Sequence, residues 1–196
     1  MTFADHHDVF IGSADDGWTF AVLNRRIPAA DAILTRAGFT AREDHGRSVY
    51  LLPPGTSEDA HERAGMAMYG LLAHTMDFVD LASTTRGPIS KAAVHFRFAD
   101  GTVTATAATD KASGILTQHG FIPSEDPARH VLPADMGERE AVNTVVRAEA
   151  HLYAEGLGVR IDLGIPTPAA IPTAARRTSQ AVLAGPTAAR AQRRTR

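Results

Sequence analysis

Hydrophobic and polar positions alternate in several short runs along the chain, which is the pattern of strands with one buried face. The clearest run is AVHFRF at residues 93–98. Two longer segments, residues 60–72 and 141–152, instead repeat apolar residues at helical spacing. Because both periods occur in one chain of ordinary apolar content, the pattern predicts an α+β fold.

Glycines mark the ends of these elements. Gly17 and Gly101 each follow an aspartate after a strand-like run, and glycine tolerates the positive φ of a tight hairpin. Gly38 and Gly120 each follow a short helix-like segment, which is typical of a left-handed helix end. Each half of the chain therefore predicts the order β-β-α-β-α-β.

The two halves of the chain contain the same short sequence motifs in the same order. Asp-Gly, Ile-Leu-Thr, Gly-Phe, Glu-Asp and Leu-Pro begin at positions 16, 33, 38, 43 and 52, and again at 100, 115, 120, 125 and 132. The offset falls from 84 to 80, so small deletions in loops align the copies. This series predicts a tandem duplication, with residues 1–84 as the first repeat and 88–164 as the second.

Size determines how the repeats relate to each other. Below about 70–80 residues, a single hydrophobic core rarely gives more than about 3–5 kcal/mol of stability. We therefore expect the repeats to bury their apolar faces against each other as a pseudo-dimer. Residues 165–196 are rich in proline and alanine, and we expect them to form a disordered tail outside the core.

Charge divides the chain in the same place. The net charge is −2, but residues 1–164 hold 14 of the 20 basic residues and all 22 acidic ones, a net charge of −8. The remaining 32 residues contain no acidic residue and six arginines: Arg176, Arg177, Arg190, Arg193, Arg194 and Arg196. Such a tail can neutralise phosphates, so nucleic acid or a nucleic-acid-handling protein is the predicted partner. A solubilising extension, or a strip folding back onto the acidic body, would have the same composition.

Several classes of protein lack support in the sequence. No cysteine is present, which excludes disulfides and thiolate chemistry. The N-terminus lacks a secretory pattern and no apolar run is long enough for a membrane span, so we expect a cytoplasmic protein with no membrane partner. The motifs of P-loops, dinucleotide sites and nucleophile elbows are missing. The sequence therefore favours a non-enzymatic binding or accessory protein, without a cofactor.

Histidines carry the alternative hypotheses. His95 and Arg97 share the outward face of the 93–98 strand, and with His130 and His151 they form a candidate lining for a cleft between the repeats. That cleft would make the protein a small ligand-binding protein or an enzyme. A third hypothesis is a structural component that acts by self-assembly.

The other histidines do not predict a metal site. His6 and His7 are adjacent, so in an extended chain their side chains point to opposite faces. His61 precedes Glu62, but the second histidine of a zinc-binding helix is missing four residues later. We expect these residues to be solvated or structural.

The order of sequence motifs and expected elements along the chain is similar to that in a group of known proteins. A helix ending in Gly-Phe at residues 120–121, a strand ending in Leu-Pro at 132–133, a Glu-led helix and the strand 159–163 carry the likeness. The chain resembles small uncharacterised proteins of high-GC actinobacteria, some of them associated with plasmids and mobile elements. The resemblance covers both repeats and implies no catalytic residues.

Overall fold

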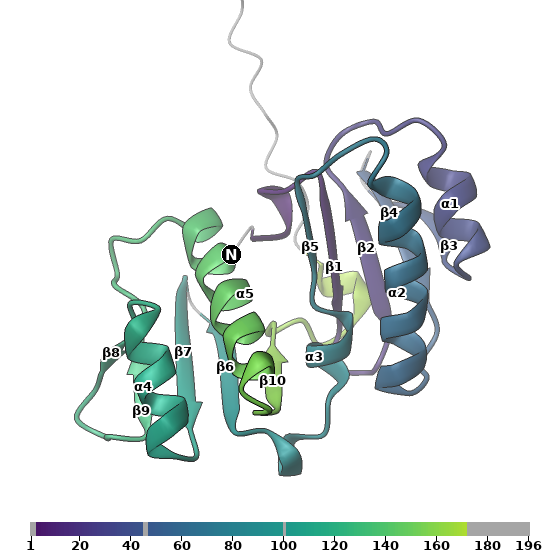
Figure 1. Cartoon of the computed structure of the whole chain (residues 1–196). Coiled ribbons are helices and arrows are strands. Elements are labelled where there is room, and N and C mark those ends of the chain that lie inside the picture. Colours follow the sequence, from purple (N-terminus) through teal and green to yellow (C-terminus); the bar gives the residue numbers. More distant parts are fainter. Residues whose placement is uncertain (1–2, 45–46, 100, 172–196) are drawn as a thin grey trace, which may run out of the picture.

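A computed structural model describes residues 3–44, 47–99 and 101–171. These residues form two five-stranded sheets with helices packed on them (Figure 1). The strand order is β3-β4-β2-β1-β5 in the first sheet and β8-β9-β7-β6-β10 in the second. The two orders are identical once the repeats are aligned.

The first repeat supplies every strand of the first sheet. Its strands are β1 (Val9–Ser13), β2 (Thr19–Leu23), β3 (Thr40–Asp44), β4 (Arg47–Leu52) and β5 (Phe78–Asp80). Its helices are α1 (Ala30–Arg36) and α2 (Ser57–Leu71), preceded by the 3-10 turn η1 (Phe3–Asp5). A short helix, α3 (Ala82–Arg86), and the turn η2 (Ile89–Lys91) connect it to the second repeat.

The second repeat has the same element order. Its strands are β6 (Val94–Ala99), β7 (Thr102–Ala107), β8 (Ile122–Pro123), β9 (Arg129–Val131) and β10 (Val159–Asp162). Its helices are α4 (Asp110–Gln118) and α5 (Glu138–Ala154), followed by the turn η3 (Pro168–Ala170). In both sheets the first strand pairs antiparallel with the second and parallel with the last.

The predicted α+β duplication is confirmed, with one more strand in each repeat than the sequence pattern indicated. The additional strands are β3 and β8, which pair antiparallel with β4 and β9 at the sheet edges. Both are poor in the alternating apolar residues that reveal a strand, because β3 reads TARED and β8 contains only Ile122 and Pro123. The glycine predictions hold: φ is 87° at Gly17, 77° at Gly101, 92° at Gly38 and 84° at Gly120.

Two hydrophobic cores hold the molecule together. One lies within the first repeat, where α1 and α2 cover the face of the first sheet that carries Val9 and Ile11. The other includes the opposite face of that sheet together with the sheet and helices of the second repeat. Within this second core Phe3 joins the two sheets, with its ring centroid 5.4 Å from that of Phe10 and 5.3 Å from that of Phe98. The repeats therefore pack as the expected pseudo-dimer.

The chain after β10 also belongs to this shared core. Leu163, Ile165 and Ile171 are each 3% exposed, and the amide of Asp15 donates to the carbonyl of Ile165 at 2.8 Å. The expectation that the chain leaves the core at residue 165 is therefore wrong for residues 165–171. The reason is the apolar outer face of the first sheet, which these residues cover. The tail expectation for residues 172–196, with its six arginines, lies outside the described residues.

The two sheets differ on the face that carries no helices. The strand registers place His95 and Arg97 of β6 at the positions that Phe10 and Gly12 occupy in β1. Thr104 likewise takes the place of Phe20. The helix-free face is thus apolar and covered in the first repeat, and polar in the second.

Candidate functional site

The four side chains expected to line a cleft lie in three different places. His95 and Arg97 do share the outer face of β6, where the Arg97 Nε lies 3.8 Å from a carboxylate oxygen of Asp162. Burial lowers the pKa of His95, and Asp162 partly opposes this effect.

His130 and His151 are on other surfaces. His130 is fully buried on the helix-facing side of β9, where its Nε2 lies 2.9 Å from the Ser113 hydroxyl of α4. His151 lies near the end of α5, with its Nδ1 3.2 Å from the Nε2 of His119. His130 thus links β9 to α4, and His151 links α5 to the end of α4. Neither histidine lies with His95 and Arg97.

A cleft of about 260 Å³ does lie between the repeats, lined by other residues. It lies where the start of α2 meets the connection through α3 and η2 and the end of the second repeat. Its polar lining residues are Ser57, Glu58, His61, Ser83, Lys91 and Tyr153. Pro88, Ala92 and Val159 supply apolar surface. The cleft is therefore made by both repeats together.

Two carboxyl groups, one from each repeat, lie beside this cleft. Glu149 of α5 is 8% exposed and receives a hydrogen bond from the Thr84 hydroxyl of α3. Burial raises its pKa to about 7; the negative charge of Asp80 adds to the rise and the Thr84 hydrogen bond opposes it. Asp80, at the end of β5, accepts a hydrogen bond from the Ala82 amide at 2.9 Å. With a pKa of about 7, the Glu149 carboxyl group changes its charge near neutral pH.

Two lining residues, His61 and Tyr153, interact electrostatically with this carboxyl pair. Burial raises the pKa of Asp80, while the Ala82 amide and the nearby His61 act in the opposite direction. Burial and Glu149 raise the pKa of the Tyr153 phenol, which also hydrogen-bonds to Ser83. A charged ligand in the cleft would therefore act on the ionisation of Glu149 through the residues that line it.

Sequence reasoning missed both carboxyl groups, although each had a signal. Glu149 falls on the apolar stripe of its helix, between Val145 and Leu152 at i+4 and i+7 spacing. Asp80 stands where the aligned strand of the second repeat has Ile161. A carboxylate at an otherwise apolar position is the type of exception that marks a functional candidate.

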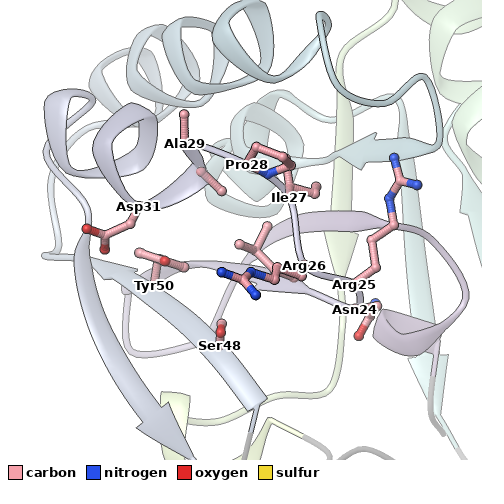
Figure 2. A pocket seen from close by; sticks show the side chains of 11 residues that line it. Asn24, Arg25, Arg26, Ile27, Pro28, Ala29, Asp31, Ser48 and Tyr50 are labelled. Atoms are coloured by element: carbon pink, nitrogen blue, oxygen red, sulfur yellow. The ribbon is translucent and has the colours of Figure 1, made fainter.

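A second hollow, of about 690 Å³, opens in the first repeat between the end of β2 and the start of α1 (Figure 2). Residues 23–31 form most of it, together with Ser48 and Tyr50 of β4. The Tyr50 phenol hydrogen-bonds to Asp31, and its pKa is raised first by burial and then by that carboxylate. This hollow does not reach the cleft-lining residues.

The second repeat keeps the same strand-to-helix contact with a shorter connection beside it. His130 and Ser113 occupy the aligned positions of Tyr50 and Asp31, and they also touch each other. Residues 24–29 connect β2 to α1, whereas only residues 108–109 connect β7 to α4. The longer connection of the first repeat forms most of the wall of the hollow.

His6 and His7 bind carboxylates instead of a shared ion. The His6 Nε2 lies 3.0 Å from Glu138 of α5, and the His7 Nδ1 lies 2.7 Å from Asp77. Within the part of the chain that the structure describes, no three His, Cys, Asp or Glu residues are arranged to hold a metal ion. Over the same residues, no helix has the length and apolar composition to span a bilayer.

Comparison of the chain with known proteins found no similar protein. Protein-family models, curated proteins and solved structures all gave no match.

Proposed function

We propose that the protein is a non-enzymatic binding protein that holds a small ligand in the cleft between its repeats. One observation carries the proposal: the walls of the cleft come from both repeats, and each repeat places one carboxyl group beside it, buried in the case of Glu149 and half-buried in the case of Asp80. Binding sites concentrate at such interfaces, and residues with shifted pKa values concentrate in binding sites.

The lining indicates the type of ligand. A volume of about 260 Å³ suits a small molecule, and Pro88, Ala92 and Val159 would contact its apolar part. Three carboxyl groups, those of Glu58, Asp80 and Glu149, lie at or beside the cleft and can accept hydrogen bonds. The cations there are Lys91 and Arg160, whose guanidinium donates to the carbonyl of the lining residue Gly87. A ligand with a cationic or hydrogen-bond-donating group fits this environment.

A melting screen with matched variants tests this proposal. The compounds would be amino acids, polyamines and nucleosides. We expect at least one of them to raise the melting temperature of the wild-type protein but not that of Ala92→Phe, which fills the cleft, or Tyr153→Ala, which removes a wall. Tyr69→Ala, at an 82% exposed tyrosine of α2, is the control and should respond like the wild type. If every stabilising compound acts equally on all four proteins, the cleft is not the site.

Chemical analysis of the stabilising compound separates a binding protein from an enzyme. Glu149 has a pKa near 7, which suits proton exchange at neutral pH. Recovery of the compound unchanged after long incubation would support binding alone. Its conversion would replace the proposal with an enzymatic one at the same cleft.

A second candidate function is association with nucleic acid through the basic tail. The supporting observation is the composition of residues 165–196, which contain six arginines and no acidic residue. Each phosphate contact would steepen the salt dependence of binding by about 0.9 logarithmic units.

Retention on DNA and RNA across a salt series tests this second candidate. The full-length protein would be compared with a full-length variant in which the six tail arginines are replaced by glutamine. We expect the wild type to be retained at low salt and the variant to elute early. Equal elution of the two proteins would remove the nucleic-acid function.

A further inference from the structure

Two neighbouring arginines at the hollow in the first repeat differ in their contacts. The Nε of Arg25 lies 2.7 Å from Asp8, and its Nη2 donates to the carbonyl of His74 at 2.7 Å. Arg26 takes part in none of the hydrogen bonds or ion pairs found among the described residues, and its side chain lines the hollow. Figure 2 shows the two guanidinium groups pointing in different directions, with that of Arg26 on the side of Tyr50 and Ser48. One cation of the hollow is therefore available to a ligand.

The backbone that carries Arg26 is held on both sides. The Asn24 side chain donates to the carbonyl groups of Ala4 and His7, the latter at 2.7 Å, and Ile27 is buried with 6% exposure. Ala29 has a φ of 60°, a left-handed conformation that costs a residue with a Cβ about 1–2 kcal/mol. Such a conformation persists because the surrounding contacts determine it, and it is found mostly at functional sites.

The remaining lining does not neutralise Arg26. Asp31 is the acidic residue of the lining, and its carboxylate already receives the Tyr50 hydroxyl. The matching connection in the second repeat, residues 108–109, is Ala-Thr, with no arginine. The fold can therefore form this corner without a cation, so Arg26 is not needed for the architecture.

We propose that this hollow binds the carboxylate group of a small organic acid, with Arg26 as its cationic partner. The planar guanidinium offers parallel donors that match the two oxygens of a carboxylate. The exposed Ser48 hydroxyl is an additional donor. Because the Tyr50 hydroxyl donates to Asp31, its oxygen is left to accept a hydrogen bond, which suits an acid that also carries a hydroxyl group. The nearby charge of Asp31 disfavours doubly charged phosphate. This site is independent of the cleft between the repeats.

Titrations followed by backbone amide resonances test the proposal on the full-length chain. The probes are sodium lactate, sodium acetate and inorganic phosphate at matched ionic strength. For lactate we expect saturable shifts at residues 24–31 in the wild type, and affinity weaker by about tenfold or more in Arg26→Gln, since one charge-assisted pair is lost. Arg36→Gln, at an exposed arginine of α1 outside the lining, is the matched control and should bind like the wild type.

The other outcomes would overturn the proposal. Equal affinity of Arg26→Gln and the wild type would show that Arg26 is not the partner. Lactate-induced shifts that occur only outside residues 24–31, or no shifts at all, would remove the site. Phosphate binding tighter than lactate would contradict the assignment to a carboxylate. Spectra of Arg26→Gln that match the wild type away from the hollow would show that the variant is folded.

Discussion

Burial sets the charge of single residues beside the cleft. Glu149 is almost fully covered by α3 and α5 contacts, so its carboxylate loses water without gaining a cation. Asp80 is affected in the same way from the other repeat. The charged groups facing Glu149 are Asp80 and, when ionised, Tyr153, whereas the Thr84 hydroxyl is its hydrogen-bond donor. The interface between the repeats is therefore more stable when Glu149 is protonated.

This arrangement predicts a pH-dependent stability that Glu149→Gln should remove. The folded pKa of about 7 lies above the unfolded value of 4.5, so the folded state holds a proton that the unfolded state has released. The contribution is complete below about pH 4.5 and is lost as the pH rises through about 7, a change of about 3 kcal/mol in the free energy of unfolding. Urea unfolding at about pH 5 and about pH 8 measures it.

Glu149→Gln should lose less stability than the wild type over that interval, because its amide stays neutral and still accepts the Thr84 hydrogen bond. Glu62→Gln, at an exposed position of α2, should keep the wild-type dependence. Parallel pH dependences of the wild type and Glu149→Gln would contradict the assigned environment of this carboxyl group.

The histidines show why sequence alone did not locate the site. Alternation in the 93–98 run correctly predicts that His95 and Arg97 share a face, because a strand has a strict two-residue period. The same reasoning cannot say which residues from distant segments meet. His61, Asp80 and Glu149 come together only when α2, β5 and α5 are packed.

At the level of elements, the turns and helix ends were easier to predict from sequence than the edge strands of the sheets. Hairpin and helix-end glycines were identified because positive φ is a requirement that few other residues meet. β3 and β8 were missed because an edge strand needs hydrogen bonds on one side only and can be polar. The cap of α2 is Thr56, whose hydroxyl accepts a hydrogen bond from the Asp59 amide at 3.1 Å, four residues before the apolar repeat that begins at residue 60.

Two glycine substitutions should have opposite effects on these elements. In Gly158→Ala, the new Cβ would lie 2.7 Å from the carbonyl oxygen of Lys91, where β10 passes the connection between the repeats. Because backbone must move, we expect a loss of about 1–3 kcal/mol. Gly114→Ala lies in α4 with nothing within 4 Å and should gain about 0.5–1 kcal/mol from helix propensity. Denaturant unfolding measures both, and equal effects would contradict the close approach at Gly158.

At the scale of the whole molecule, the repeats are alike in topology and unlike in how they are covered. The outer face of the first sheet needs Phe3 and residues 163–171 to cover its apolar side chains. The second sheet presents His95, Arg97 and Thr104 at the aligned positions. Alignment of the repeats alone predicts the shared topology, but it cannot predict that the end of the second repeat crosses over to complete the first.

Truncating the crossing side chains should destabilise the protein. Ile165→Ala and Ile171→Ala each remove a side chain that is 3% exposed, and we expect each to cost about 2–4 kcal/mol in unfolding free energy. Ile89→Ala is the control, since Ile89 is 63% exposed, and it should change stability by less than about 0.5 kcal/mol. Similar urea midpoints for all three variants would show that the segment does not belong to the core.

The crossing segment also has a consequence for biosynthesis. A ribosome releases the strands of the first repeat well before residues 163–171, so Phe10 and Phe20 remain uncovered while the second repeat is still being translated. N-terminal units commonly fold first, while the rest of the chain is still being synthesised. The first repeat of this chain cannot complete its core in that way. Its first-made half becomes complete only when nearly the last described residue has left the exit tunnel.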